Sequence, residues 1–193
     1  MREKQFLGGS MASINKLYEE TEAKQQIIAY LNEQEIKVIT LNNFIHEQEF
    51  AKIKKNLQDI KFDLEFTPTE SKYEFKKNEL KELETDIRKF IQSLFNKKLS
   101  IKTSIIKKIK AGYYTILSDK PEKKKIKIFY YLKKEIPNAA GGYHVFVKED
   151  STTLHPEENS LTLFIADKSK DFIKYVDSRA EKKENIFLEL ELK

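Results

Sequence analysis

The fold is decided by His-Pro-Glu-Glu-Asn-Ser-Leu-Thr-Leu-Phe, residues 155–164, in which a polar turn leads directly into an apolar strand. It is preceded by Ala-Gly-Gly-Tyr-His-Val-Phe-Val (140–147), where two glycines indicate a turn or bulge before another short strand. From residue 99 onward, short β-rich runs alternate with turn residues, a pattern that favours an all-β sandwich or barrel. The predicted strands cover residues 99–109, 113–117, 126–132, 143–147, 151–154, 160–165, 171–176 and 185–192.

The first hundred residues have a mainly helical pattern. The strongest helix is predicted at its end, where Leu83, Ile87 and Phe90 belong to one apolar stripe and the other faces are charged. The predicted elements are helices over 13–34, 46–59 and 78–96 and strands over 36–41 and 61–66, with a loop at Pro68 and Ser71. Helices followed by strands predict an α+β domain with the helices packed on one face of the sheet.

Length and composition favour one globular domain. The chain has 193 residues, 39% hydrophobic and 35% charged, and chains of this size bury roughly 70% of their unfolded surface. We expect a leader and helix over 1–35 and a single domain over 36–193. No apolar run approaches the roughly 20 residues that span a bilayer, so no membrane partner is expected. With no Cys there is no disulfide or thiolate ligand, and a cytoplasmic location is the default.

The charge pattern gives little support for nucleic-acid binding. The net charge is +5, from 36 basic and 31 acidic residues, and only Arg2, Arg88 and Arg179 are arginines. Arginine is the preferred side chain for phosphate and guanine recognition, so this composition argues against a dedicated nucleic-acid reader. The Lys-rich stretch 120–127 could contact phosphate, but a short charged run is more often a solvated turn.

In their order, these segments resemble the double-stranded β-helix of the 2-oxoglutarate/Fe(II) oxygenases, the prolyl-4-hydroxylase-like branch in particular. The resemblance begins near residue 36 and includes Ile-Thr-Leu-Asn-Asn-Phe-Ile…Glu-Phe (39–50). Its most specific match is the turn Pro-Glu-Glu-Asn-Ser-Leu (156–161). It implies a jelly-roll, cupin-like barrel supported by N-terminal helices.

The resemblance also implies an iron site whose ligands this sequence lacks. Family members hold Fe(II) with two His and one carboxylate, and an Arg or Lys binds the distal carboxylate of 2-oxoglutarate. At these positions the sequence has Ser118 for the first His, Lys120 for the Asp, Lys174 for the second His and Asn185 for the basic residue. Asp119 lies between the first two and is expected to point the wrong way. We therefore expect no bound metal and no cofactor.

The histidines cannot restore this site by a shift in alignment. Only His46, His144 and His155 are present, and none falls in the two stretches where the resemblance requires one. Most histidines in such contexts are hydrogen-bonded or surface residues. An unorthodox site would combine two of them with a carboxylate; the candidates are His144 and His155 with Asp119, Glu122 or Asp177.

The functional hypothesis is a catalytically silent oxygenase-fold protein, a pseudoenzyme that acts as a binding or scaffold module. Its partner would be an unknown protein or a small anionic ligand, bound by a polar, cation-lined pocket at the barrel mouth. The residues of that pocket would be Tyr114, Ser118, Lys120, Lys174 and Asn185. Two alternatives remain: an active dioxygenase that hydroxylates a protein or small molecule, using Fe(II) and 2-oxoglutarate with non-standard ligands, and a nucleic-acid-associated protein that uses its Lys-rich surface.

Overall fold

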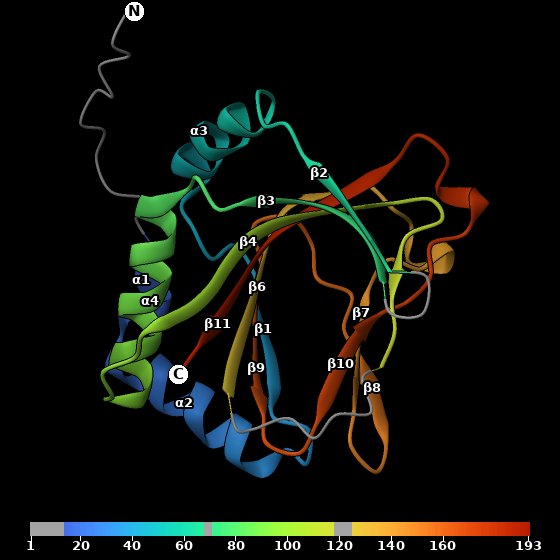
Figure 1. Ribbon diagram of the computed structural model, residues 1–193. Helices are drawn as coiled ribbons and strands as arrows, with labels where there is room; N and C mark the ends of the chain where they lie inside the picture. The colour runs from blue at the N-terminus through green and yellow to red at the C-terminus, as the bar shows by residue number, and fades with distance from the viewer. Residues whose placement is uncertain (1–13, 68–70, 118–124) are drawn as a thin grey trace, which may run out of the picture.

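Two antiparallel sheets dominate the computed structural model, which describes residues 14–67, 71–117 and 125–193 (Figure 1). Within these ranges the larger sheet has eight strands, and the short β5 (Tyr114–Thr115) pairs only with β3. The other seven lie in the order β1 (Val38–Leu41), β9 (Leu161–Ala166), β6 (Lys125–Lys134), β11 (Glu184–Leu192), β4 (Ile101–Lys110), β3 (Ser71–Lys77) and β2 (Asp63–Thr67). The smaller sheet has the order β10 (Lys170–Ile173), β7 (His144–Val147) and β8 (Ser151–Thr153).

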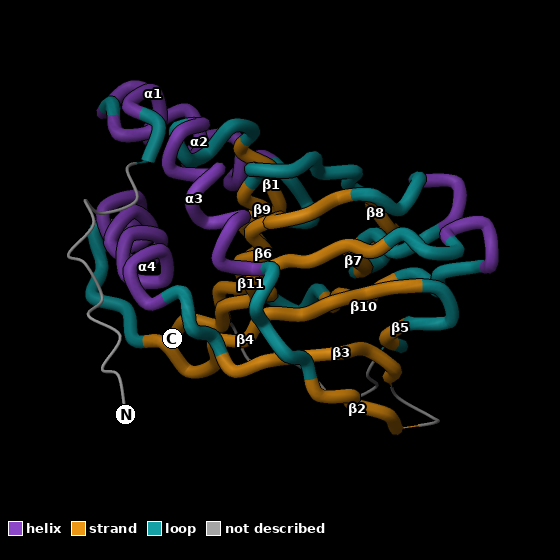
Figure 2. The backbone as a smooth tube through the Cα atoms, turned by 90° about the horizontal axis from the view of Figure 1, so that it is seen from above, coloured by secondary structure: helices purple, strands orange, loops and turns teal. Residues whose placement is uncertain are grey.

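The helices lie together at one side of the larger sheet, as predicted (Figure 2). Apolar side chains of the helices pack there against the outward-facing side chains of the sheet, and Ile87, Ile91 and Leu188 are fully buried. The helices are α1 (Lys16–Glu19), α2 (Thr21–Glu33), α3 (Glu47–Leu57) and α4 (Lys81–Phe95), and single 3₁₀ turns occur at η1 (Asn138–Ala140) and η2 (Ser178–Ala180).

A second core lies between the two sheets. Successive residues of a strand point to opposite faces, so one strand can serve two cores. In β6, Ile128 and Tyr130 belong to the core under the helices, whereas Phe129 and Tyr131 belong to the core between the sheets. Both faces of its central strands are covered, and the larger sheet forms one wall of a barrel whose other wall is the smaller sheet.

The stretch that decided the fold joins the barrel to its N-terminal support. Asn159 adopts a left-handed backbone conformation with φ of 57° at the turn before β9. Its side-chain oxygen accepts hydrogen bonds from Ile45 N at 3.0 Å and Tyr130 Oη at 2.8 Å, and its amide donates to Ile45 O at 2.7 Å. One buried side chain therefore fixes the segment between β1 and α3 against the end of β6.

The paired glycines form a turn, as expected. Gly141 has φ of 91°, and a Cβ atom built on it would lie 2.0 Å from Tyr175 O. Only glycine permits this approach of two backbone segments. The next residue, Gly142, donates its N–H to Lys174 O at 3.0 Å. The turn therefore fixes the position of the segment that follows β10.

One predicted helix differs from the structure, and one observed strand was not predicted. The single helix expected over 13–34 is divided at Glu20, which is extended with ψ of 140°. The first piece is held elsewhere, because Tyr18 Oη donates to Asn42 O at 2.6 Å and Asn15 N donates to Phe44 O at 2.8 Å. The strand β3 was not predicted, although Tyr73 and Phe75 alternate with charged residues there.

The strand β3 is held to β4 by the carboxylate of Glu74. Glu74 forms an ion pair of 2.6 Å with Lys108 and a second with Lys110, and it accepts a hydrogen bond from Tyr113 Oη at 2.8 Å. Burial raises the pKa of the Glu74 carboxyl, but these three donors outweigh burial and lower the pKa to about 2. In the described ranges, no helix has the length and apolar character needed to cross a bilayer.

Candidate functional site

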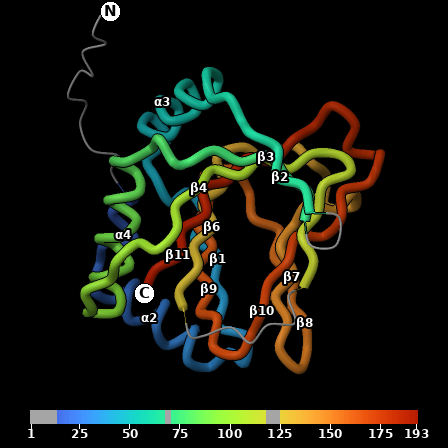
Figure 3. Tube along the Cα trace, viewed as in Figure 1, coloured from blue at the N-terminus to red at the C-terminus, as the bar shows by residue number. Residues whose placement is uncertain are grey.

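Two ion pairs join strands that border the space between the two sheets, in the interior of the barrel. The two sheets face each other across this space in Figure 3. Lys107 of β4 contacts Glu189 of β11, with 2.7 Å between Nζ and Oε2 and side-chain exposures of 11% and 18%. Lys127 of β6 pairs with Asp171 of β10, and each side chain is 11% exposed. The second pair joins the larger sheet to the smaller one. Among the described residues, the barrel interior therefore contains at least these two pairs of opposite charge.

The protein environment keeps the first of these pairs ionised. Burial lowers the pKa of the Lys107 ammonium, but Glu189, with smaller contributions from Tyr73 and Asp171, more than offsets burial, so the net pKa is raised. Burial raises the pKa of Glu189, whereas Lys107 and Lys127 lower it, with a net decrease. The aromatic ring of Tyr73 lies 4.5 Å from Lys107 Nζ and adds a cation–π contact.

His144 is a neutral residue of this interior. Its Nδ1 is hydrogen-bonded to Tyr131 Oη at 2.6 Å, and its ring centroid lies 4.0 Å from that of Phe129. Burial lowers the pKa of the imidazole to about 4, and burial also raises the pKa of Tyr131. His144 is therefore uncharged near pH 7, and one of its two possible ligand nitrogens is already in use.

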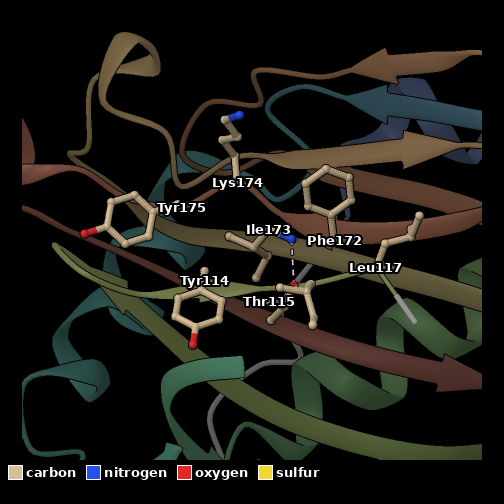
Figure 4. Close-up of a pocket in the computed structure, with 8 residues that line it drawn as sticks. Tyr114, Thr115, Leu117, Phe172, Ile173, Lys174 and Tyr175 are labelled. Carbon is tan, nitrogen blue, oxygen red and sulfur yellow. Dashed lines mark hydrogen bonds between the residues drawn. The ribbon is translucent and has the colours of Figure 1, made fainter. Parts of the chain in front are cut away.

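A groove of about 490 Å³ opens at the barrel mouth, where β5 and β10 end (Figure 4). Ile173 N donates to Thr115 Oγ1 at 2.6 Å and links the two strands. The ring centroids of Tyr114 and Tyr175 lie 6.3 Å apart at one end of the groove. The groove is mainly apolar and is lined by Tyr114, Thr115, Ile116, Leu117, Phe172, Ile173, Lys174 and Tyr175.

The predicted site residues fall in different places. Tyr114 and Lys174 both line the groove, and the Lys174 side chain extends away from Thr115 (Figure 4). Asn185 is fully buried: its oxygen accepts from Glu135 N and Ile136 N, both at 3.0 Å, and its amide donates to Gly142 O at 3.2 Å. The amide of Asn185 therefore braces the connection from β6 to β7.

The remaining predicted positions, Ser118, Asp119, Lys120 and Glu122, lie outside the described residues. The anion-binding role of the mouth stays a prediction.

The side chains at hand do not fit an iron site of the kind that the resemblance implies. In the part of the chain that the structure describes, no three His, Cys, Asp or Glu side chains are close enough together to hold a metal ion. His46 is exposed before α3, and His155 is exposed beside the ring of Tyr143, with centroids 4.8 Å apart. His144 is enclosed by aromatic rings. The sequence between 117 and 125 adds no His or Cys.

Sequence reasoning missed the two interior ion pairs and the apolar character of the groove. Strand alternation carried a signal for the ion pairs. Lys127 lies two and four positions before Phe129 and Tyr131, and Glu189 lies two positions after Phe187, so each charged residue shares a strand face with aromatic residues. If those aromatic rings face the barrel interior, then the charged residues do so as well. Their buried positions could therefore be inferred, but not their pairing.

Comparisons with solved structures show which known proteins share this fold. An oxidoreductase of the 2OG-Fe(II) oxygenase family from Burkholderia pseudomallei is similar, with a TM-score of 0.68, 12% identity, and coverage of 90% of this chain and 92% of that chain. A prolyl-4-hydroxylase from Pseudomonas putida gives a TM-score of 0.62 at 10% identity, covering 88% of this chain and 98% of that one.

A third structure is a prolyl hydroxylase from Trichoplax adhaerens in complex with a peptide fragment of a hypoxia inducible factor. It has a TM-score of 0.65 and 14% identity, and covers 92% of this chain and 91% of that chain. No family model matches the chain, and no curated protein matches its sequence. The chain therefore has the double-stranded β-helix fold of the 2-oxoglutarate/Fe(II) oxygenases, as predicted, and prolyl-4-hydroxylases are among its structural neighbours.

Proposed function

We propose that this protein is a catalytically inactive member of the oxygenase fold and acts as a binding module. The observation that carries the proposal is the pair of interior ion pairs, Lys107–Glu189 and Lys127–Asp171. An oxygenase of this kind needs room and a free cation for the dianion 2-oxoglutarate, together with three metal ligands. Here both interior lysines already neutralise carboxylates.

The energetics of the interior support the same conclusion. Removing one partner from a buried ion pair costs about 3–5 kcal/mol, because an uncompensated charge is left behind. To bind 2-oxoglutarate through Lys107 or Lys127, the protein would have to leave Glu189 or Asp171 unpaired beside an added dianion. Repulsion between the unpaired protein carboxylate and the two carboxylates of 2-oxoglutarate opposes this change of partner.

The residues near the mouth support the proposal independently. Lys174 stands where the resemblance requires the second His, and an ammonium group repels a divalent cation unless it loses its proton. Asn185 stands where a basic residue is required, and its amide is engaged by the backbone of the β6–β7 connection. Lys174 therefore offers no metal ligand, and Asn185 no cation, at the position where the resemblance requires one.

Thermal unfolding of the metal-stripped full chain under anaerobic conditions tests this proposal. A ligand at 100 times its dissociation constant stabilises a protein by about 2.7 kcal/mol, which raises the melting temperature by roughly 5–10 °C for a chain of this size. We expect no rise with Mn(II) and 2-oxoglutarate together. The Pseudomonas putida prolyl-4-hydroxylase serves as the positive control. A rise that requires both components would overturn the proposal.

A further inference from the structure

The groove at the ends of β5 and β10 exposes several large apolar side chains to solvent. Ile116 is 49% exposed, Leu117 37% and Tyr175 56%. Single exposed apolar side chains are ordinary, but a contiguous set in a concave surface is typical of a binding site. Here three such side chains line one groove together with Tyr114 and Phe172.

The apolar surface continues from the groove onto the hairpin of β2 and β3. The strand registers pair Phe66 with Lys72 and Lys72 with Tyr114, so these three residues form one row across adjacent strands. The strands concerned, β2, β3 and β5, lie near one another in Figure 2. Phe66 is 56% exposed and Leu64, on the same face of β2, is 58% exposed. Neighbouring strands lie about 5 Å apart, so the row places Phe66 roughly 10 Å from Tyr114.

The charges beside this surface are cationic. Lys174 lines the groove, and Lys72 lies over the rings of Phe66 and Tyr113, at 5.8 and 5.4 Å from their centroids. Among the described residues, neither lysine has a carboxylate within ion-pair distance. By contrast, all three lysines of the neighbouring segment 107–110 are paired with glutamates. The surface thus combines apolar side chains with two cations that have no carboxylate partner in the ranges 14–67, 71–117 and 125–193.

We propose that this groove binds an extended segment of a partner protein in which large apolar side chains stand next to Asp or Glu. The inference rests on the proposed function, because it treats the mouth as a docking surface rather than a reaction site. Apolar anchors would enter the groove between Leu117 and Tyr175, and acidic side chains would meet Lys174 and Lys72. Such contacts combine desolvation of aromatic and aliphatic surface with complementary charge.

The aliphatic side chains of the groove favour a peptide over other occupants. Ile116 and Leu117 have no flat ring on which a nucleotide base could stack, so only the rings of Tyr114, Phe172 and Tyr175 offer the stacking contact that single strands use. The N–H of Ile173 is already bonded to Thr115 Oγ1, so a partner would be held by side chains in the groove rather than by adding a strand at this residue.

Selection from a displayed library of random linear peptides on the immobilised full chain tests the proposal. We expect enrichment of sequences that combine large apolar residues with Asp or Glu. Ile116→Asp should abolish binding of the enriched peptides, whereas Leu17→Asp, at a residue 57% exposed on α1, should leave it unchanged. Tyr175→Ser provides a second groove variant. Thermal unfolding establishes that each variant is folded.

Reversing the charge of one lysine measures how much electrostatic attraction contributes to peptide binding. Lys174→Glu should weaken binding of an acidic peptide about tenfold, which corresponds to about 1.4 kcal/mol, and Lys16→Glu on α1 should not. The proposal is wrong if no sequence is enriched, if the groove variants bind as well as the wild type, or if charge reversal has no effect. Displacement of the peptide by oligo(dT) would indicate a nucleic-acid site instead.

This result is independent of the metal experiment. If peptide selection fails while Mn(II) and 2-oxoglutarate still give no thermal shift, the docking surface is refuted and the inactive barrel stands. A thermal shift with both components refutes the inactive barrel whatever the peptides do.

Discussion

Replacing Glu189 by Gln should destabilise the protein strongly, because the change leaves Lys107 charged and buried without its partner. The two side chains are 11% and 18% exposed, and their charged atoms lie 2.7 Å apart. At an effective dielectric constant of about 20, unit charges at this distance attract by about 6 kcal/mol before desolvation is subtracted. Removal of one partner from a buried pair costs about 3–5 kcal/mol.

We therefore expect Glu189→Gln to lower the free energy of unfolding by about 3 kcal/mol, since the amide oxygen still accepts a hydrogen bond from Lys107. For a chain of this size this corresponds to a fall of roughly 6–12 °C in melting temperature. Urea denaturation followed by circular dichroism measures the free energy directly.

A matched double variant separates loss of the pair from loss of packing. Lys107→Met with Glu189→Leu replaces both charges by apolar groups, and such replacements of buried pairs are often neutral or stabilising. We expect the double variant to recover most of the stability lost in Glu189→Gln. If Glu189→Gln unfolds within about 0.5 kcal/mol of the wild type, the pair is not buried as described and the reasoning about the interior is refuted.

Three further predictions concern acid stability and the glycine turn. The pKa of His144 is 6.5 in the unfolded chain and about 4 in the folded protein, so the stabilisation by neutral His144 is complete above pH 6.5 and is lost as the pH falls toward 4. His144→Phe should therefore reduce the fall in unfolding free energy between pH 6.5 and 4 by about 3 kcal/mol. Urea denaturation as a function of pH measures this difference. The ionised Glu74 carboxylate contributes its full stabilisation above pH 4.5, and this stabilisation is lost as the pH falls toward 2. Glu74→Gln should therefore reduce the pH dependence of the unfolding free energy between pH 4.5 and 2 and leave it unchanged between pH 6.5 and 4.5. If the variant and the wild type show the same pH dependence, the assignment to Glu74 is wrong. Gly141→Ala should cost several kcal/mol, since its Cβ would lie 2.0 Å from Tyr175 O; a melting temperature equal to that of the wild type would show that this turn is wrongly described.

The barrel could be predicted from sequence because its strands carry a local signal. In β6, five consecutive apolar residues occupy positions 128–132, and the polar turn containing Asn159 is followed at once by an apolar run. Such patterns reflect burial of both faces of a strand and need no knowledge of its neighbours. The strand β3 was missed because Pro68 and Ser71 suggested a loop and outweighed the alternation of Tyr73 and Phe75.

The interior of the barrel could not be predicted in the same way. Lys127 and Asp171 are 44 residues apart in sequence, and they meet only because β6 and β10 belong to facing sheets. Likewise, the last strand was predicted to begin at Asn185, close to the start of β11, but the role of the Asn185 amide depends on Glu135 and Ile136, which the connection after β6 brings beside it. Partners across sheets are set by topology and not by local pattern.

Titration of the full chain with Mn(II), followed by electron paramagnetic resonance with and without 2-oxoglutarate, tests the central claim most directly. Free aqueous Mn(II) gives a sharp six-line spectrum that broadens when the ion binds to a protein. Our account predicts that the free-ion signal stays proportional to added Mn(II), with or without 2-oxoglutarate, because the barrel interior is occupied by its own ion pairs. Stoichiometric loss of the signal that tightens when 2-oxoglutarate is added would contradict it.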